Sequence, residues 1–206
     1  MRKEKLEELK NYIKELTPVK AMSNQSLSQG KGFVTVENYT YQLKDGRVLT
    51  RDKVLKGSKK GDAVIILPIT KEKNTVLVIQ TRPNVKEGVS VELPAGYVED
   101  NETKEEAARR ELKEETGFVT NQLILLGEFY QDQGISSAYN SSFLALDCQK
   151  KYSQMLDKDE FIRYYECKFE EALELLEKGY IKDLQSQYTL EKAKTLVKKG
   201  TLIQYK

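Results

Sequence analysis

Apolar and polar positions change their spacing along this chain, and each spacing predicts a different kind of element. Near the start, apolar residues recur at helical intervals: Leu6, Leu9, Ile13 and Leu16. Thr17-Pro18 ends this pattern, so the sequence predicts an amphipathic helix over residues 3–16. The polar segment 23–32, rich in Ser, Gln and Gly, is predicted to be a loop.

Two extended runs follow, at residues 33–43 and 47–55, with Lys44-Asp45-Gly46 between them. An Asp-Gly pair between β-rich runs is typical of a β-hairpin, because both residues tolerate the positive φ of a tight turn. Residues 56–60 are polar and are predicted to connect this hairpin to the rest of the chain.

Short β-branched runs without alternation lie at residues 63–68 and 75–79, which is typical of strands buried on both faces. A further strand is predicted at 89–93, leading into a turn at Pro94-Ala95-Gly96. The remaining strands are predicted near residues 123–130, 141–147 and 161–168.

Three more helices are predicted from periodicity and capping signals. Thr103 and Glu106 form a capping-box pattern, and Gly117 suits the left-handed position after a helix, which places one helix at 104–116. The second helix has its first apolar position at Phe169 and ends at Gly179. The last carries apolar positions from Leu190 onward and closes at Gly200.

Strands interleaved with helices predict an α/β fold in which a mixed β-sheet lies between helices, an α/β/α arrangement. At 206 residues the chain is long enough for one well-buried core and a small appendage. We therefore divide it into an N-terminal helix plus β-hairpin extension, residues 1–60, and a main domain, residues 61–206.

The composition is that of an ordinary globular protein, with 39% hydrophobic and 32% charged residues and a net charge of +2. This balance gives no electrostatic argument for a nucleic-acid or membrane partner. No apolar run approaches the roughly 20 residues of a membrane span. Cys148 and Cys167 have no metal-ligand or redox-motif spacing, so we expect buried, reduced thiols in a soluble cytoplasmic protein.

The chain contains no histidine, which excludes Ser-His-Asp and histidine–zinc chemistry. Any general base must then be a carboxylate, a lysine, a tyrosine or a metal-bound hydroxide. Glu111, Glu114 and Glu115 fall on one side of the helix predicted at 104–116, because residues three and four apart share a face. Carboxylates this close repel one another, whereas a hard divalent cation would reverse the sign of that interaction.

The spacing Gly-x5-Glu-x7-Arg-Glu-Leu-x-Glu-Glu-x-Gly-Phe runs from Gly96 to Phe118 and resembles the Nudix box without a missing position. A charged surface helix could carry the glutamates by itself. It would not need glycines at both ends, or adjacent carboxylates in register with an arginine. The chain is therefore identified as a member of the Nudix hydrolase superfamily, and the predicted α/β/α arrangement corresponds to the Nudix fold.

The resemblance implies roles for the residues of the box. Glu111, Glu114 and Glu115 would bind one or more Mg²⁺ or Mn²⁺ ions that also hold a diphosphate, and Arg110 would orient one of these glutamates. Gly96 would permit a turn that brings the Ala95 carbonyl near the metal. For Glu102, a role in the box and simple stabilisation of the helix N-terminus are both open.

Similarity beyond the box points to the ADP-ribose/ADP-sugar pyrophosphatase group. It covers the segments 78–82, 92–96, 169–172 and 179–183. In that group the N-terminal strands help to build a homodimer whose sites take substrate residues from both subunits. By match, Arg82 would contact substrate, Glu92 would shape the site, and Arg51 would reach the partner's pocket, although plain surface roles for both arginines stay open.

The loop that carries a catalytic glutamate in that group departs from the pattern here. Gly134 is retained, but Gln133 stands at the proline position, and Ser137 or Ala138 stands at the glutamate position. Asp132, a box glutamate or a metal-bound hydroxide could each serve as the base, and Asp132 could equally be only a turn residue.

The leading hypothesis is hydrolysis of ADP-ribose or a related ADP-sugar to AMP and a sugar phosphate. A second is house-cleaning hydrolysis of modified nucleoside triphosphates or dinucleoside polyphosphates. A third, from another class, is a non-catalytic Nudix module that senses ADP-ribose. Such modules tend to lose box carboxylates, and this chain keeps every one.

Overall fold

The computed structural model of the protein describes residues 3–16, 33–42, 46–56 and 61–198. In these ranges the helices are α1 (Lys3–Leu16), α2 (Lys104–Thr116), α3 (Phe169–Glu177) and α4 (Leu184–Lys198). The strands are β1 (Val34–Gln42), β2 (Val48–Lys56), β3 (Ala63–Thr70), β4 (Asn74–Thr81), β5 (Val89–Glu92), β6 (Ala95–Tyr97), β7 (Phe118–Val119), β8 (Gln122–Tyr130), β9 (Tyr139–Lys150) and β10 (Ile162–Lys168). The loop predicted at 23–32, Asp45 of the hairpin turn, the connector 57–60 and Gly200 lie outside the described residues.

The main sheet is mixed. β3 and β4 pair only beside their connecting turn, at Ile69 and Thr75, and then separate. From there β4 pairs antiparallel with β5 and β10, while β3 pairs antiparallel with β6 and parallel with β9. β9 carries β8 and β7 antiparallel along its other edge. The separation of β3 from β4 leaves β5 and β6 side by side in the chain but in different parts of the sheet.

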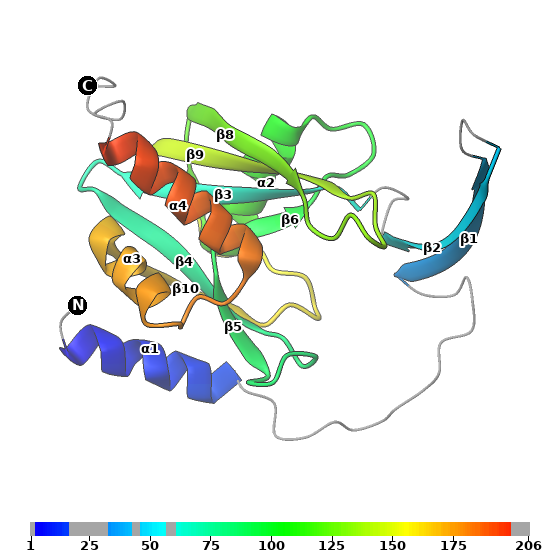
Figure 1. The fold of residues 1–206 in the computed structure, drawn as a ribbon. Helices are drawn as coiled ribbons and strands as arrows, with labels where there is room; N and C mark the ends of the chain where they lie inside the picture. The colour runs from blue at the N-terminus through cyan, green and yellow to red at the C-terminus, as the bar shows by residue number, and fades with distance from the viewer. Residues whose placement is uncertain (1–2, 17–32, 43–45, 57–60, 199–206) are drawn as a thin grey trace.

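Helices cover both faces of this sheet (Figure 1). On β3, Ile65 and Leu67 pack into a core that includes residues of α1, α3 and α4. Their neighbours Val64 and Ile66 point the other way, into a core built with α2. Both sets are fully buried, as the run without alternation predicted. The α/β/α sandwich expected from the sequence is therefore confirmed.

Helix α2 begins and ends where its capping signals predicted. The Thr103 side chain accepts from the Glu106 backbone N–H at 3.2 Å, and the Glu106 carboxylate accepts from the Thr103 backbone N–H at 2.7 Å. Gly117 has φ +73° and donates its backbone N–H to the Lys113 carbonyl. These caps fix the register of α2, and so fix which of its side chains face the strands.

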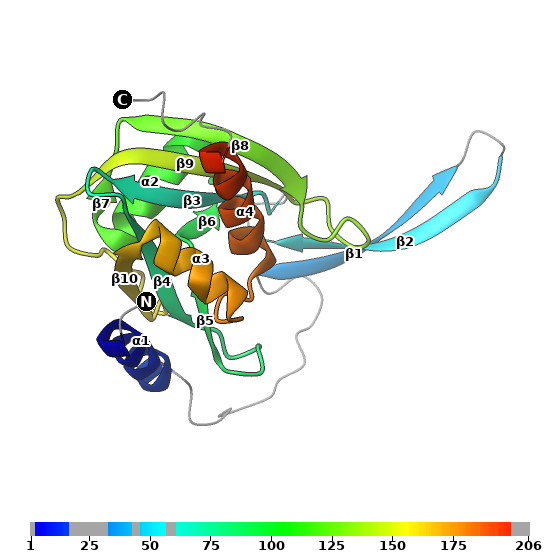
Figure 2. The ribbon, with the colours of Figure 1, turned by 60° about the vertical axis from the view of Figure 1, so that its left-hand side comes forward.

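Strands β1 and β2 form an antiparallel hairpin that projects from the body of the molecule (Figures 1 and 2). Its link to the body includes the Val54 backbone N–H, which donates to the Ile135 carbonyl at 2.7 Å, and the ring of Phe33, 5.2 Å from that of Tyr97. Val36 and Val48 on the hairpin are 47% and 66% exposed. The projecting hairpin thus presents uncovered apolar surface.

Several element boundaries differ from those predicted. α4 begins at Leu184, more than one turn before the periodic apolar positions start. The reason is a cap: the Asp183 carboxylate accepts a hydrogen bond from the Ser186 backbone N–H at 2.8 Å. Ala95 and Gly96, predicted to lie in a turn, instead form the short strand β6 with Tyr97, and this strand pairs with β3. Cys148 and Cys167 are free and buried, and burial raises the pKa of each thiol to about 12. None of the helices in the described ranges has the length and apolar composition needed to cross a membrane.

Candidate active site

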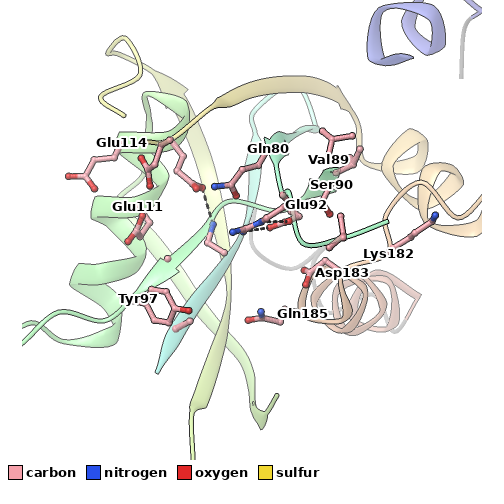
Figure 3. Close-up of a pocket in the computed structure, with 18 of the residues that line it drawn as sticks. Gln80, Val89, Ser90, Glu92, Tyr97, Glu111, Glu114, Lys182, Asp183 and Gln185 are labelled. Atoms are coloured by element: carbon pink, nitrogen blue, oxygen red, sulfur yellow. Dashed lines mark hydrogen bonds and ion pairs between the residues drawn. The ribbon is translucent and has the colours of Figure 1, made fainter. Parts of the chain in front are cut away.

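One large cavity, of about 1220 Å³, brings together segments that lie far apart in the sequence. Its walls come from β4, β5 and β6, from α2, from the loop 151–161 and from the connection between α3 and α4. In Figure 3, Glu111 and Glu114 on α2 lie on one side, and Lys182, Asp183 and Gln185 lie on the other. The cavity therefore opens where the carboxylates predicted to bind metal meet the end of the sheet.

Arg110 holds the carboxylates of α2 in place. Its NH1 group donates to Glu111 Oε1 at 2.7 Å and to Glu114 Oε2 at 3.1 Å. Its other two nitrogens donate to Glu102, at 3.2 and 2.7 Å, and NH2 also donates to the Tyr97 carbonyl at 2.9 Å. One guanidinium thus links two box glutamates to the turn before the helix, and the attraction lowers the pKa of Glu102.

Glu115 is only 4% exposed and lies at the floor of the cavity. Its Oε2 accepts from the Ala95 backbone N–H at 3.0 Å, which ties α2 to β6. Burial raises the pKa of Glu115 well above its ordinary range, and the nearby charges of Glu111 and Glu160 raise it further. The buried Glu115 and the half-buried Glu111 therefore require a nearby positive charge if both carboxylates are to be ionised.

Glu111 faces the same requirement. Burial raises the pKa of Glu111 to about 7 even though Arg110 beside it acts in the opposite direction. Gly96 explains how the side chain comes so near the strand, because a Cβ at position 96 would overlap the Glu111 carboxyl group. The first glycine of the box is therefore needed for the close approach of α2 to β6.

Arg82 and Glu92 form a two-point ion pair at the opposite wall. Arg82 Nε donates to Glu92 Oε1 at 2.9 Å, and NH2 donates to Oε2 at 2.8 Å. Glu92 is 8% exposed, whereas the Arg82 side chain keeps 44% of its surface exposed. Glu92 therefore holds Arg82 with one side of its guanidinium open to the cavity.

Not every residue predicted for the site lines this cavity. Arg82, Glu92, Ala95, Gly96, Arg110, Glu111, Glu114 and Glu115 do. Arg51 is exposed on β2 and donates to the Thr50 carbonyl, while Asp132 and Gly134 belong to a turn in which the Asp132 carbonyl accepts from Ile135 and Ser136. Within a single chain, these three residues are not among those that line the cavity.

The loop 151–161, which the sequence did not single out, supplies a wall instead. Met155, Asp157, Asp159 and Glu160 line the cavity. The Glu160 charge raises the pKa of both Glu111 and Glu115, so its carboxylate lies close enough to the box to act on these two glutamates. The only signal in the sequence was the acidic run Asp157-Lys158-Asp159-Glu160, which has no motif spacing and looks like an ordinary polar loop.

The donors at the cavity suit a hard divalent cation, since they are carboxylate oxygens, and burial raises the pKa of both the buried Glu115 and the half-buried Glu111. As placed, however, no three acidic side chains in the described ranges surround a common point. Two of the carboxylates pair with Arg110 instead, Glu111 at 2.7 Å and Glu114 at 3.1 Å. The carboxylate oxygens are therefore of the kind that bind magnesium or manganese, but in the described ranges they are not gathered around one metal position.

Comparison with known proteins settles the family. A model of the NUDIX domain matches residues 59–205. The chain belongs to the NUDIX domain family. The predicted enzyme class, a Nudix pyrophosphohydrolase, is confirmed with it, and Nudix hydrolases generally need a divalent metal ion.

Curated relatives of this Nudix protein include two pyrophosphatases. The ADP-ribose pyrophosphatase of Bacillus subtilis is 32% identical over 151 residues, which is 73% of this chain and 79% of the relative. The GDP-mannose pyrophosphatase of Escherichia coli K12 is 32% identical over 160 residues, 73% of this chain and 83% of the relative. A crystal structure of an ADP compounds hydrolase superposes with a TM-score of 0.70 at 21% identity, covering 85% of this chain and 91% of that one, and shows the same fold.

Proposed function

We propose that the protein hydrolyses the diphosphate bond of a nucleoside diphosphate linked to a sugar, with ADP-ribose or a related ADP-sugar as substrate and AMP and a sugar phosphate as products. The observation that carries this proposal is the shared cavity. It joins the carboxylates of α2 to the Arg82–Glu92 pair and to the α3–α4 connection. A cavity of about 1220 Å³ has room for a substrate with two ribose-sized groups on a diphosphate.

Within this proposal, Glu111, Glu114 and Glu115 hold magnesium or manganese, together with the Ala95 carbonyl. The metal, when bound, neutralises phosphate charge and lowers the pKa of bound water. Arg110 orients Glu111 and Glu114 from behind, through the bonds it makes to both carboxylates. Arg82, held at its back by Glu92, offers its free side to a phosphate or ribose oxygen.

Hydrolysis requires a proton acceptor for the attacking water, and we propose Glu160 for this role. Glu160 lines the cavity, and its charge acts on both Glu111 and Glu115 of α2. The water oxygen forms a bond to one phosphorus, its proton passes to Glu160, and the bond from that phosphorus to the bridging oxygen breaks. Gln131 of the loop 131–138 lines the cavity of its own chain, whereas Asp132 and Gly134, proposed from the sequence for the substrate site, would take part only by reaching the cavity of another subunit.

We further propose that residues 1–60 form a dimerisation element and that the enzyme works as a homodimer in the cytoplasm. Support comes from the uncovered apolar residues of the hairpin and from its base, where Phe33 and Lys56 reach the cavity wall. A second copy seated on the hairpin could bring Arg51 to its partner's cavity. The buried free thiols of Cys148 and Cys167 are consistent with a reducing compartment.

The test is a substrate panel with AMP or phosphate release as the readout. It compares ADP-ribose and ADP-glucose with GDP-mannose, 8-oxo-dGTP and a diadenosine polyphosphate, each with Mg²⁺, with Mn²⁺ and with EDTA. We expect the highest kcat/KM for an ADP-sugar and loss of turnover in EDTA. Preference for 8-oxo-dGTP or the diadenosine compound would support the house-cleaning alternative, and tight binding of ADP-ribose without turnover would support a sensing module.

A further inference from the structure

The C-terminal end of α2 has an unusual set of hydrogen-bond partners. The last carbonyls of a helix have no partner within the helix and must be satisfied from elsewhere. Here four consecutive carbonyls, from Glu114 to Gly117, accept from one short segment, residues 150–155. The donors are the backbone N–H of Met155, the side chains of Gln154 and Lys150, and the backbone N–H groups of Lys151 and Tyr152.

Two of these contacts bear directly on the carboxylates of the box. The Met155 backbone N–H donates to the Glu114 carbonyl at 2.8 Å, and Gln154 Nε2 donates to the Glu115 carbonyl at 2.6 Å. Gly117 belongs to the same arrangement, since a Cβ there would overlap the Tyr152 carbonyl. The segment 150–155 is therefore seated on the very turn of α2 that carries Glu114 and Glu115.

Gln154 differs from the other donors because it makes a second bond. The same Nε2 donates to the Ile162 carbonyl at 3.3 Å, and Ile162 is the first residue of β10. One side-chain amide thus joins the end of α2 to the point where the loop 151–161 returns to the sheet. Next to that point, the Phe161 carbonyl accepts from the Thr81 backbone N–H at 3.1 Å.

Glu160 lies between these fixed points. Its carboxylate accepts from the Asp157 backbone N–H at 3.0 Å, and its own N–H donates to the Asp157 carbonyl at 3.1 Å. Residues 157–160 therefore form a small turn closed by two hydrogen bonds. Its position relative to α2 depends on how the two ends of the loop are held.

We propose that Gln154 is a positioning residue that clamps the loop 151–161 between the C-terminal end of α2 and the start of β10, and so sets Glu160 against the carboxylates of the box. This inference rests on the proposed function for the role of Glu160. The clamping role itself is assigned to Gln154, which is half-buried and does not line the cavity. Gln154 acts on the chemistry only through the loop.

The first experiment needs no substrate. Amide hydrogen exchange is compared in the wild type, Gln154→Met and Ser153→Ala. Methionine keeps the length and volume of glutamine but cannot donate a hydrogen bond, and Ser153 is the exposed neighbour with an unaltered clamp. We expect faster exchange at Met155 and at residues 157–160 in Gln154→Met, and wild-type exchange in Ser153→Ala. Equal exchange in all three proteins would overturn the clamp, whatever the enzyme hydrolyses.

The second experiment uses ADP-ribose turnover. When a catalytic group is held slightly out of position, kcat falls by about 10- to 100-fold. KM changes little, because the substrate contacts remain. We therefore expect Gln154→Met to lower kcat by about 10-fold with KM near the wild-type value. A variant that changed only KM, or only the unfolding temperature, would contradict a positioning role.

A double-variant comparison separates the clamp from general loss of stability. If Gln154 acts through Glu160, then Gln154→Met should have almost no further effect on kcat in a Glu160→Gln background. Multiplying effects would show that the two residues act independently and would overturn the proposal. If Glu160→Gln alone keeps full turnover, the role proposed for Glu160 fails, and the exchange experiment still decides whether the clamp exists.

Discussion

Two loops, residues 131–138 and residues 151–161, flank the catalytic region, and they differ in what they touch. The loop 131–138 lies against the hairpin, where the Ile135 carbonyl accepts from the Val54 backbone N–H at 2.7 Å. The loop 151–161 lies against the end of α2 and contributes Asp157, Asp159 and Glu160 to the cavity wall. Family resemblance directed attention to the first loop, whereas the packing of the chain places acidic side chains from the second beside the box.

The difference has a physical origin in the strand order. β8 and β9 form an antiparallel pair, so the loop joining them turns back at the end of the sheet that carries the hairpin. The loop after β9 must cross from β9 to β10 on the far edge of β4, and its path runs over the C-terminal end of α2. The order of the strands in the sheet thus decides which loop lies beside Glu111 and Glu115.

The largest expected effect concerns Glu115, the buried carboxylate on which the charge of Glu160 in the loop 151–161 acts. Glu115→Gln should lower turnover by about 10²-fold or more, because it removes a buried charge from the proposed metal site while keeping the bond from the Ala95 N–H. Turnover is measured at saturating ADP-ribose and Mg²⁺. Glu105→Gln, an exposed glutamate in the first turn of the same helix, serves as the control and should keep wild-type turnover. Near-normal activity of Glu115→Gln would remove the residue from the mechanism.

A smaller effect on turnover kinetics is expected for a substitution in the hairpin, which is hydrogen-bonded to the loop 131–138. If a partner subunit receives Arg51, Arg51→Ala should raise KM by about 10-fold with little change in kcat, the scale for losing one charge-assisted hydrogen bond. Thr50→Ala, whose side chain points to the other face of the hairpin, is the matched control. A monomer in sedimentation at working concentrations would end the shared-site role of Arg51, and with it any role for the loop 131–138 in a partner's cavity.

The smallest expected effect is on stability and concerns the burial of the Glu111 carboxyl group in the box. Burial raises the pKa of Glu111 from 4.5 to about 7, so the folded metal-free protein keeps a proton there that the unfolded chain releases. The stabilisation is present below about pH 4.5 and is lost as the pH rises to about 7. In EDTA, Glu111→Gln should therefore melt roughly 5 °C above the wild type at pH 8 and gain less at pH 5. A wild type that is the more stable of the two at pH 8 would contradict this sign.

Much of the site was predictable because its residues are local in sequence. The capping residues Thr103 and Gly117 fixed the limits of α2, and the spacing of Glu111, Glu114 and Glu115 placed them on one face. Arg82 and Glu92 were proposed separately and only by resemblance, and their ion pair was not predicted, since ten positions separate the two residues in the sequence. Glu160 and Gln154 could not be predicted at all, because their role depends on where β10 returns beside β4.

The fold was predictable to a similar degree. Runs without alternation correctly indicated strands buried on both faces, and repeated apolar positions indicated the helices. The early start of α4 was missed, because the capping pair Asp183 and Ser186 precedes the periodic stretch. The parallel pairing of β3 with β9 was also beyond prediction, since it joins strands more than 70 residues apart.

The central claim is that the loop 151–161, through Glu160, completes the site formed by the box. The most direct test compares kcat for ADP-ribose in Glu160→Gln and Asp132→Asn, at saturating substrate and Mg²⁺. Each variant removes one negative charge and keeps the side-chain shape, so the two loops are tested by the same chemical change. We predict a loss of about 10²-fold or more for Glu160→Gln and about the wild-type value for Asp132→Asn. The opposite result, with Asp132→Asn inactive and Glu160→Gln active, would contradict the account.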